Sequence, residues 1–199
     1  MLEVAGPTLT LRVPEAVDAP ALFALGSDLD VTRWFSWGPY ASEDEPRRWI
    51  GEAARRRNAG EQLELVIDRA GEVLGVTGLT EFSRRDRRAM VGTWLGREHW
   101  GTGVNAESKA LILHLAFATL GLARVGAYAN VDHGRSQRAL ERLGFTRDGV
   151  LRAWHRHPDG PHDVVVYSLL ASEWQSAVPV EVRGELPPSF AALSARGSA

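Results

Sequence analysis

The chain has 199 residues, of which 44% are hydrophobic and 24% charged, and its formal net charge is -2 at pH 7. This length suits a single domain with its own core, and the near-neutral charge argues against nucleic acid as the main partner. The absence of cysteine excludes disulfides, cysteine–zinc sites and a thiol nucleophile. Because no signal-like N-terminus and no apolar run of about 18 residues is present, we expect a soluble, cytoplasmic protein.

The first part of the chain alternates strand-like and helix-like segments. Residues 34–40 form an aromatic loop, and Ser42 with Glu45 three positions later is a capping-box pattern that predicts a helix start. Residues 69–71 have the composition of a hairpin turn. The predicted elements are a strand at 8–13, helices at 15–25 and 42–58, and strands at 62–68 and 72–81.

The second part places one long helix between two strands. The predicted elements are a strand at 89–95, a helix at 106–120, a strand at 124–129, a helix at 135–143 before Gly144, and a hairpin of strands at 145–154 and 163–170. They predict an α/β (α+β) domain: a mostly antiparallel, twisted sheet of about seven strands with four helices and one parallel β-α-β crossover. We expect residues 1–180 to form this single domain and residues 181–199 to be a poorly ordered tail.

The most informative segment is the glycine turn of residues 100–105 (WGTGVN), between a predicted strand and the long helix. The first amides of a helix lack intrahelical acceptors, and the helix dipole adds about half a positive charge there. Such a turn suits a diphosphate. Gly101, Gly103 and Ala106 also fit a dinucleotide fingerprint, but antiparallel strands precede the turn and only one crossover follows it, which argues against a dinucleotide domain.

Two distant motifs, residues 99–103 (HWGTG) and 135–145 (RSQRALERLGF), resemble those of the GNAT acetyltransferases. The resemblance runs from about Thr8 to Trp174 and is greatest to the ribosomal-protein N-terminal acetyltransferases and their small-molecule relatives. Residues 149–152 (GVLR) and 167–170 (YSLL) fit the same branch. The resemblance implies a GNAT-like fold and an enzyme that moves acetyl from acetyl-coenzyme A to a primary amine.

The resemblance also implies a coenzyme site along this core. Backbone groups of the strand before the turn would pair with the pantetheine arm, and one amide there would polarise the thioester carbonyl. Asn105 is larger than the usual Gly or Ala at its position, and its amide either reaches a phosphate or caps the helix. The implied coenzyme contacts are Trp94, Leu95, Gly96, Trp100, Gly101, Thr102, Gly103, Val104, Asn105, His133 and Ser136.

The catalytic groups that the resemblance implies depart from the usual family pattern. Leu140 replaces the tyrosine that often protonates the departing thiolate, so Ser136 is either the substitute acid or a helix cap. His133 replaces an asparagine that holds the pantetheine arm, and it either makes that hydrogen bond, carries a proton or lies exposed on a loop. Glu81 is the first candidate for the general base, or else a surface charge at a strand end.

The acceptor pocket is expected between the N-terminal helical segment and the final hairpin. Its aromatic residues form either a lid on the core or a wall for an apolar or cationic acceptor. Asp163 would orient the amine or pair with an arginine of the hairpin. We expect no metal, because His155, His157 and His162 lack a recognisable ligand pattern. The substrate-binding candidates are Trp34, Phe35, Trp37, Tyr40, Trp154, His155 and Asp163.

Lysine usage singles out one further residue. Lys109 is the only lysine among 23 basic residues, and it lies within the predicted long helix. Either the arginine excess reflects genome composition, or this helix needs a compact ammonium where a guanidinium would not fit.

Three functions stay open at this point. The preferred one is acetylation of a protein or peptide N-terminus, and the second is acetylation of a small amine such as an amino acid, polyamine or antibiotic. The third is a non-catalytic acyl-CoA-binding sensor, which the departures at Leu140 and His133 motivate. Related domains often pair, so a homodimer is a further expectation.

Overall fold

The computed structural model describes residues 2–190, and its centre is one nine-stranded sheet in the order β7-β8-β6-β5-β4-β3-β2-β1-β9. Neighbouring strands are antiparallel except for β5 and β6. The strands are β1 (Glu3–Ala5), β2 (Thr10–Arg12), β3 (Leu63–Arg69), β4 (Glu72–Ser83), β5 (Arg88–Leu95), β6 (Arg124–Asn130), β7 (Thr146–His157), β8 (Gly160–Leu170) and β9 (Glu181–Arg183). The helices are α1 (Ala19–Gly26), α2 (Leu29–Thr32), α3 (Asp44–Ala59), α4 (Val104–His114) and α5 (Gly134–Arg142). No helix in this described part of the chain has both the length and the apolar character needed to cross a bilayer.

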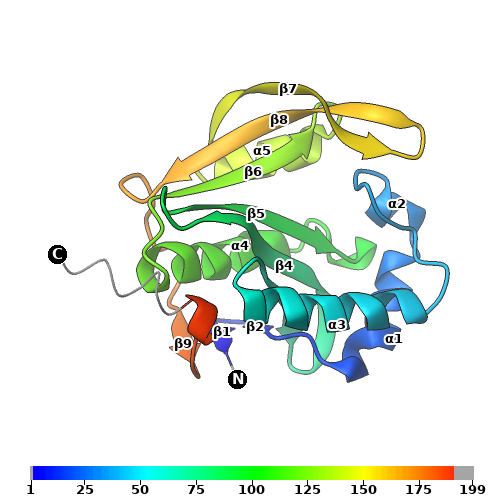
Figure 1. Cartoon of the computed structure of the whole chain (residues 1–199), viewed down its shortest axis with the longest axis horizontal. Helices are drawn as coiled ribbons and strands as arrows, with labels where there is room; N and C mark the ends of the chain where they lie inside the picture. The colour runs from blue at the N-terminus through cyan, green and yellow to red at the C-terminus, as the bar shows by residue number, and fades with distance from the viewer. Residues whose placement is uncertain (1, 191–199) are drawn as a thin grey trace.

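The sheet buries an apolar layer on each face. Alternate β5 side chains point to opposite faces, so Val91 belongs to the large cluster against α4 and α5, whereas Trp94 belongs to a smaller one. The smaller cluster includes Leu22 of α1 and Ile50 of α3. Helices α4 and α5 therefore cover one face, and α1 and α3 cover the other (Figure 1).

The parallel pair of strands is short. Residues 88–90 of β5 pair with residues 124–126 of β6, and the pairing ends there. Beyond this point β5 stays paired with β4 as far as Leu95, while β6 stays paired with β8 as far as Asn130. The two strands therefore diverge after Met90, and one edge of β5 is left facing a gap.

A carboxylate fixes the start of α4 beside the first strands. Glu107 accepts hydrogen bonds from the Thr8 amide (2.7 Å), the Thr8 hydroxyl (2.6 Å) and the Leu9 amide (2.9 Å). Glu107 lies in the first turn of α4, where the helix dipole favours a negative charge. This contact sets where the N-terminus of α4, and with it the glycine turn, lies against the sheet.

The predicted mixed, mostly antiparallel sheet with one parallel crossover is confirmed, but its size is not. The structure has nine strands where about seven were predicted. The two additional strands, β1 and β9, have three residues each and pair with each other, although they come from opposite ends of the chain. The single turn of α2 was also not predicted. The long helix begins at Val104 and continues beyond α4 as a π-helical turn over Leu115–Thr119.

Residues 181–190 do not form the poorly ordered tail that was expected. β9 pairs with β1, and Phe190 is fully buried with its ring centroid 5.0 Å from that of Phe82. The Ser189 hydroxyl donates to the carbonyl of Arg57 (2.9 Å). The segment is rich in Pro and Gly, so its order comes from tertiary packing that local composition does not show. The rest of the predicted tail, residues 191–199, lies outside the described residues.

Phe190→Ala should lower the free energy of unfolding by about 3–5 kcal/mol, because it removes a buried aromatic side chain from the core. Val17→Ala is the control: Val17 is 76% exposed, and its truncation should change stability by less than about 0.5 kcal/mol. Urea unfolding followed by circular dichroism measures both. Equal small effects would contradict the packing of residues 181–190 against the core.

Candidate active site

The glycine turn before α4 forms a cradle of unpaired amides. Gly101 and Gly103 have φ values of +77° and +92°, which favour glycine, and a Cβ on either would meet nothing within 4 Å. The Thr102 hydroxyl donates to the carbonyl of His99 (2.7 Å) and holds the turn. No acceptor among residues 2–190 takes a hydrogen bond from the amides of residues 101–106. Free donors at a helix N-terminus, facing open space, are what a diphosphate requires.

Val104 and Asn105 begin α4 and contribute in different ways. Val104 is buried in the core, so only its backbone can face a ligand. Gly103 occupies the N-cap position, which means that Asn105 does not cap the helix. Its partly exposed side chain lies in the first turn, so the contact with a phosphate is the role that stays open for it.

Arg135 adds a positive charge beside this turn. Its guanidinium carbon lies 3.7 Å from the centroid of the Trp100 ring, a cation–π contact. The Trp100 indole in turn donates to the carbonyl of Leu95 (3.0 Å). Sequence reasoning missed Arg135, because this contact joins two separate motifs. The geometry makes the guanidinium a candidate partner for the phosphates.

The free edge of β5 presents backbone groups to the gap. The Gly96 amide donates to the carbonyl of Leu74 (2.9 Å) and is therefore engaged with β4. Because backbone groups alternate along a strand, Thr93 and Leu95 direct theirs toward the gap. The Leu95 carbonyl is already bonded to the Trp100 indole, so its amide is the group left for a ligand. Trp94 places its ring on the α1–α3 face, where it meets Trp37 edge to face with centroids 5.3 Å apart. Of the three β5 residues predicted to contact the pantetheine arm, the geometry thus favours Leu95. It also makes Thr93 a candidate contact that was not predicted.

Lys109 is buried between α4 and β5. Its ammonium nitrogen donates to the hydroxyl of Thr93, which lies 2.7 Å from the hydroxyl of Thr77. Only 5% of Lys109 is exposed, and it forms no ion pair with a described residue. Burial lowers the pKa of Lys109 to about 7. The only lysine therefore lies directly beneath the strand whose edge faces the gap.

His133 and Ser136 lie at the start of α5. The His133 ring stacks on Trp34, with centroids 4.9 Å apart. Burial, followed by the charges of Arg135 and Arg33, lowers the pKa of His133 to about 4, so His133 is neutral at pH 7 and poorly suited to donate a proton as imidazolium. His133 holds the N-cap position, and the Ser136 hydroxyl makes no hydrogen bond within residues 2–190. Ser136 is therefore not the cap, and its hydroxyl is available to a ligand.

Glu81 lies at an irregularity of β4 and reaches across β5 to β6. Its φ of +51° is unusual for a residue other than glycine. The Tyr128 hydroxyl donates to the Glu81 carboxylate (3.3 Å), and the Tyr128 ring lies 6.0 Å from Trp154 and 5.5 Å from His155. Burial, then the charge of Glu81, raises the pKa of Tyr128. Glu81 is thus a partnered carboxylate, and Tyr128 is a neighbour that sequence reasoning missed.

Asp163 supports the final hairpin. Its carboxylate accepts a hydrogen bond from the amide of Ala153 (2.7 Å), which has a φ of +51° and lies where the β7–β8 register shifts. This bulge re-aims the residues that follow it, and the next two are Trp154 and His155. Asp163 forms no ion pair with a described arginine, so the expected pairing is absent. Its observed role is to shape the bulge.

A cavity of about 510 Å³ opens on the α1–α3 face beside β5. Phe35, Trp37 and Tyr40 of the aromatic loop line it, whereas Trp34 stacks on His133 instead. The rest of its lining comes from α3, Gln62 and strands β3 to β5, and none of the lining residues belongs to the final hairpin. The predicted acceptor residues therefore do not share one pocket: three line this cavity, Trp154 and His155 lie around Tyr128, and Trp34 lies at His133.

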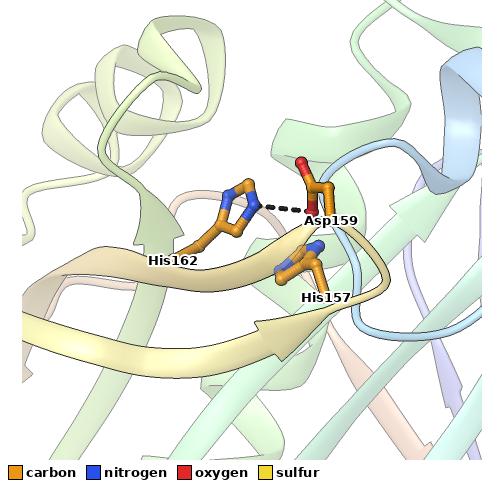
Figure 2. Close-up of side chains that lie close together, drawn as sticks. All are labelled: His157, Asp159 and His162. Atoms are coloured by element: carbon orange, nitrogen blue, oxygen red, sulfur yellow. Dashed lines mark hydrogen bonds and ion pairs between the residues drawn. The ribbon is translucent and has the colours of Figure 1, made fainter.

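Three titratable residues meet at the tip of the β7–β8 hairpin. Figure 2 shows His157, Asp159 and His162 side by side. Their potential ligand atoms all lie within 4.8 Å of one another. The expectation that these histidines lack a metal-ligand pattern is therefore wrong for His157 and His162. The arrangement has the composition of a metal site, so its hydrogen bonds decide its chemistry.

Those hydrogen bonds indicate a structural role, in which His162 links Asn130 of β6 to Asp159 in the hairpin turn. Asn130 accepts through its oxygen from the Asp132 amide (2.9 Å), which turns its NH₂ group to His162 Nδ1 (3.0 Å). His162 then carries its proton on Nε2 and donates it to Asp159 (2.8 Å). A metal-bound histidine instead donates its second N–H to an acceptor. The donor at Asn130 does not fit that pattern.

Lys109→Met should remove a pH dependence of stability. The pKa of Lys109 is about 7 in the folded chain and near its usual value of about 10.4 in the unfolded chain. Between these values the unfolded chain binds more protons, so the contribution of Lys109 to the free energy of unfolding rises with pH, by about 1.4 kcal/mol per pH unit. Urea unfolding from about pH 7 to 10 measures this contribution as the free energy of unfolding of wild type minus that of the variant.

Arg85→Met is the control for that series. The Arg85 side chain is 96% exposed, so the difference between wild type and this variant should stay flat with pH. A flat difference for Lys109→Met as well would show that the lysine is not a neutralised, buried amine.

The sequence is similar to those of known acetyltransferases, and this similarity identifies its family. Residues 8–146 match the model described as an acetyltransferase (GNAT) domain. The chain is 31% identical over 164 residues to the uncharacterized N-acetyltransferase YoaA of Bacillus subtilis (strain 168), covering 81% of this chain and 93% of that protein. It is 24% identical over 127 residues to the ribosomal-protein-serine acetyltransferase of Escherichia coli (strain K12), covering 64% and 71% respectively.

A solved structure shows the same fold. The microcin C7 self-immunity acetyltransferase MccE, crystallised in complex with acetyl-CoA and AMP, has a TM-score of 0.77 and 21% identity over 82% of this chain and 93% of that one. The free amides and open glycines of the turn before α4 suit the diphosphate of that coenzyme. Since the family model spans most of the chain and YoaA aligns over nearly its whole length, the chain belongs to the GNAT acetyltransferases, enzymes that acetylate amines with acetyl-CoA.

Proposed function

We propose that this chain acetylates the N-terminal amine of a protein or peptide, with acetyl-CoA as the donor. The observation that carries the proposal is the alignment of three features across the sheet. The amide cradle lies at the start of α4, the gap beside β5 follows it, and the aromatic cavity opens on the opposite face. A coenzyme anchored at the cradle and an acceptor in the cavity would approach the same gap from opposite faces.

The site residues divide the chemistry among them. The coenzyme supplies an acetyl group activated as a thioester. The neutral amine nitrogen forms a bond to the carbonyl carbon, the C–S bond breaks, and the sulfur leaves as a thiolate that takes up one proton. Backbone amides at the edge of β5 would donate to the carbonyl oxygen as its negative charge develops. Ser136 would supply the proton to the thiolate, and Glu81 would accept the proton that the amine releases.

His133 and Arg135 would hold the coenzyme in place. Because the pKa of His133 is about 4, its neutral ring is better suited to a hydrogen bond with the pantetheine arm than to proton transfer. Arg135 stays charged at any physiological pH and lies at Trp100 beside the cradle, where phosphates would meet it. The two residues would therefore position the coenzyme while Ser136 acts on it.

Two other functions have support from specific observations. The walled cavity beside β5 suits a small amine, such as an amino acid, a polyamine or an antibiotic. Leu140 in place of the family's usual tyrosine supports a non-catalytic acyl-CoA sensor. The similarity to a ribosomal-protein-serine acetyltransferase supports the peptide acceptor, and we infer that this acceptor is used.

Thiol release from acetyl-CoA, measured against a panel of peptides and free amines, separates the three functions. We expect turnover with peptides that have a free N-terminus and none with the same peptides blocked at the N-terminus. Turnover with free amines alone would identify a small-molecule enzyme. Coenzyme binding by calorimetry, without turnover for any member of the panel, would contradict catalysis and favour the sensor.

Ser136→Ala should lower kcat by roughly 10²-fold, the lower range for loss of a general acid, and change the pH profile of kcat. The KM for acetyl-CoA should change much less. Ser176→Ala, at an exposed serine outside the site, is the control and should leave the kinetics unchanged. An unaltered kcat and pH profile in Ser136→Ala would rule out the serine as the proton donor.

A further inference from the structure

One row of residues crosses the sheet on the face that holds the cavity. Glu64 of β3 pairs in register with Gly78 of β4, and Gly78 pairs with Gly92 of β5. All three residues line the cavity. Extending the β5–β6 register by two residues places Tyr128 of β6 level with Gly92, across the gap. The row thus runs from a carboxylate over two glycines to the tyrosine that contacts Glu81.

The two glycines turn this row into a trough. A Cβ on Gly92 would meet nothing within 4 Å, so the space above it is open. A Cβ on Gly78 would come within 2.9 Å of the Glu64 Cα and 3.0 Å of the Glu64 Cγ, so glycine here leaves room for the Glu64 side chain to lie over β4. Trp37 and Trp49 are among the rings that wall the cavity. An elongated ligand can therefore cross the backbone at Gly92 and reach the Glu64 side chain between aromatic walls.

Glu64 is a carboxylate without a counter-ion at one end of the trough. It forms no ion pair with a described residue, and its Oε2 is buried without a hydrogen-bond partner in that part of the chain. Burial raises the pKa of the Glu64 carboxyl, and Trp49 and Arg56 offset only part of this effect. Arg56 itself is paired with Glu52 (2.9 Å). A buried carboxylate oxygen without a hydrogen-bond partner is stabilised most by a ligand group that is positively charged and donates a hydrogen bond.

The distance across the sheet separates Glu64 from the reaction. The Glu64 side chain leans over β4, because its Cγ lies 3.0 Å from where a Cβ on Gly78 would stand. With neighbouring strands about 4.8 Å apart, this side chain is about one spacing from β5 and about two spacings, roughly 10 Å, from the far side of the gap. That separation is too large for direct proton transfer from an amine at the β5–β6 gap, since a base must lie within hydrogen-bond reach. Glu81 and Tyr128 lie near the gap instead. Glu64 is therefore placed to bind the far end of the acceptor.

We propose that Glu64 binds a second cationic group of the acceptor, an ammonium or guanidinium roughly 10 Å from the amine that is acetylated. This rests on the proposed acetyltransferase function. The rings of Trp37, Tyr40 and Trp49 would add cation–π attraction. Arg48 also borders the cavity, but it is exposed, so water and salt screen its charge. The cation is a basic side chain of a peptide or the far end of a linear diamine.

Glu64→Gln tests the proposal with matched acceptors. Peptides with lysine beside the N-terminal residue are compared with norleucine peptides, and linear diamines with monoamines of equal length. The variant should raise KM about tenfold or more for the cationic members, since it removes one partner of a partly buried charge pair. KM for the uncharged members and for acetyl-CoA should stay within about twofold of wild type. Glu72→Gln, on the exposed end of β4, makes the same charge change outside the cavity and is the control.

Calorimetry without acetyl-CoA separates this proposal from the proposed function. The same peptides and amines are titrated into wild type and Glu64→Gln. Weaker binding of the cationic members to the variant supports the cation site, even if no acetyl transfer is seen. Equal affinities in the two proteins overturn it, even if transfer occurs. The peptide and diamine arms identify which source of the cation the trough prefers.

Gly92→Ala is an independent test that leaves the Glu64 carboxylate unchanged. Its added methyl would meet nothing within 4 Å, so the fold should persist with an unchanged melting temperature. The methyl would occupy the trough floor, and we expect several-fold weaker binding of the elongated cationic members. Unchanged binding of these members would show that the ligand does not lie over Gly92 and would overturn the proposal. This test remains valid if Glu64→Gln fails to fold.

Discussion

The separation of β5 from β6 is the constraint on which the rest of the site depends. Pairing between the strands ends at Met90, so the following residues of β5 keep backbone groups that no strand satisfies. Such groups need partners when they are buried, and an amide-rich pantetheine arm can supply them. β4 holds the other edge of β5, and the contacts among Lys109, Thr93 and Thr77 hold it from the α4 face. The strand can therefore keep its place beside an open gap.

The same gap joins two faces with different chemistry. On the α4 side, Glu107 fixes the helix N-terminus, the glycine turn offers free amides, and Arg135 adds a positive charge. These features suit an anion. On the α1–α3 side, aromatic rings and the unpaired carboxylate of Glu64 suit an amine or another cation. In the proposed function, the sheet would thus hold the coenzyme and the acceptor on opposite faces, and the two would meet at one edge of β5.

Much of the fold could be predicted because its long elements carry strong local patterns, and the cradle could be predicted because its glycines and helix are contiguous. β1 and β9 could not, since each is short and their pairing joins opposite ends of the chain. The contacts of Arg135 with Trp100 and of Tyr128 with Glu81 join distant segments. The row from Glu64 to Gly92 depends on strand register, which a single sequence does not state. For the same reason, the sequence suggested an amine contact or an arginine partner for Asp163, and not its hydrogen bond to the bulge at Ala153.

Amide chemical shifts during a titration with acetyl-CoA test the central claim most directly. In nitrogen-labelled protein, the largest shifts should fall on the amides of residues 101–106 and on the β5 amides of Thr93 and Leu95. Those of β1 and β9, at the far edge of the sheet, should stay in place. Shifts that spare the turn and the edge of β5, or no binding at all, would contradict the account.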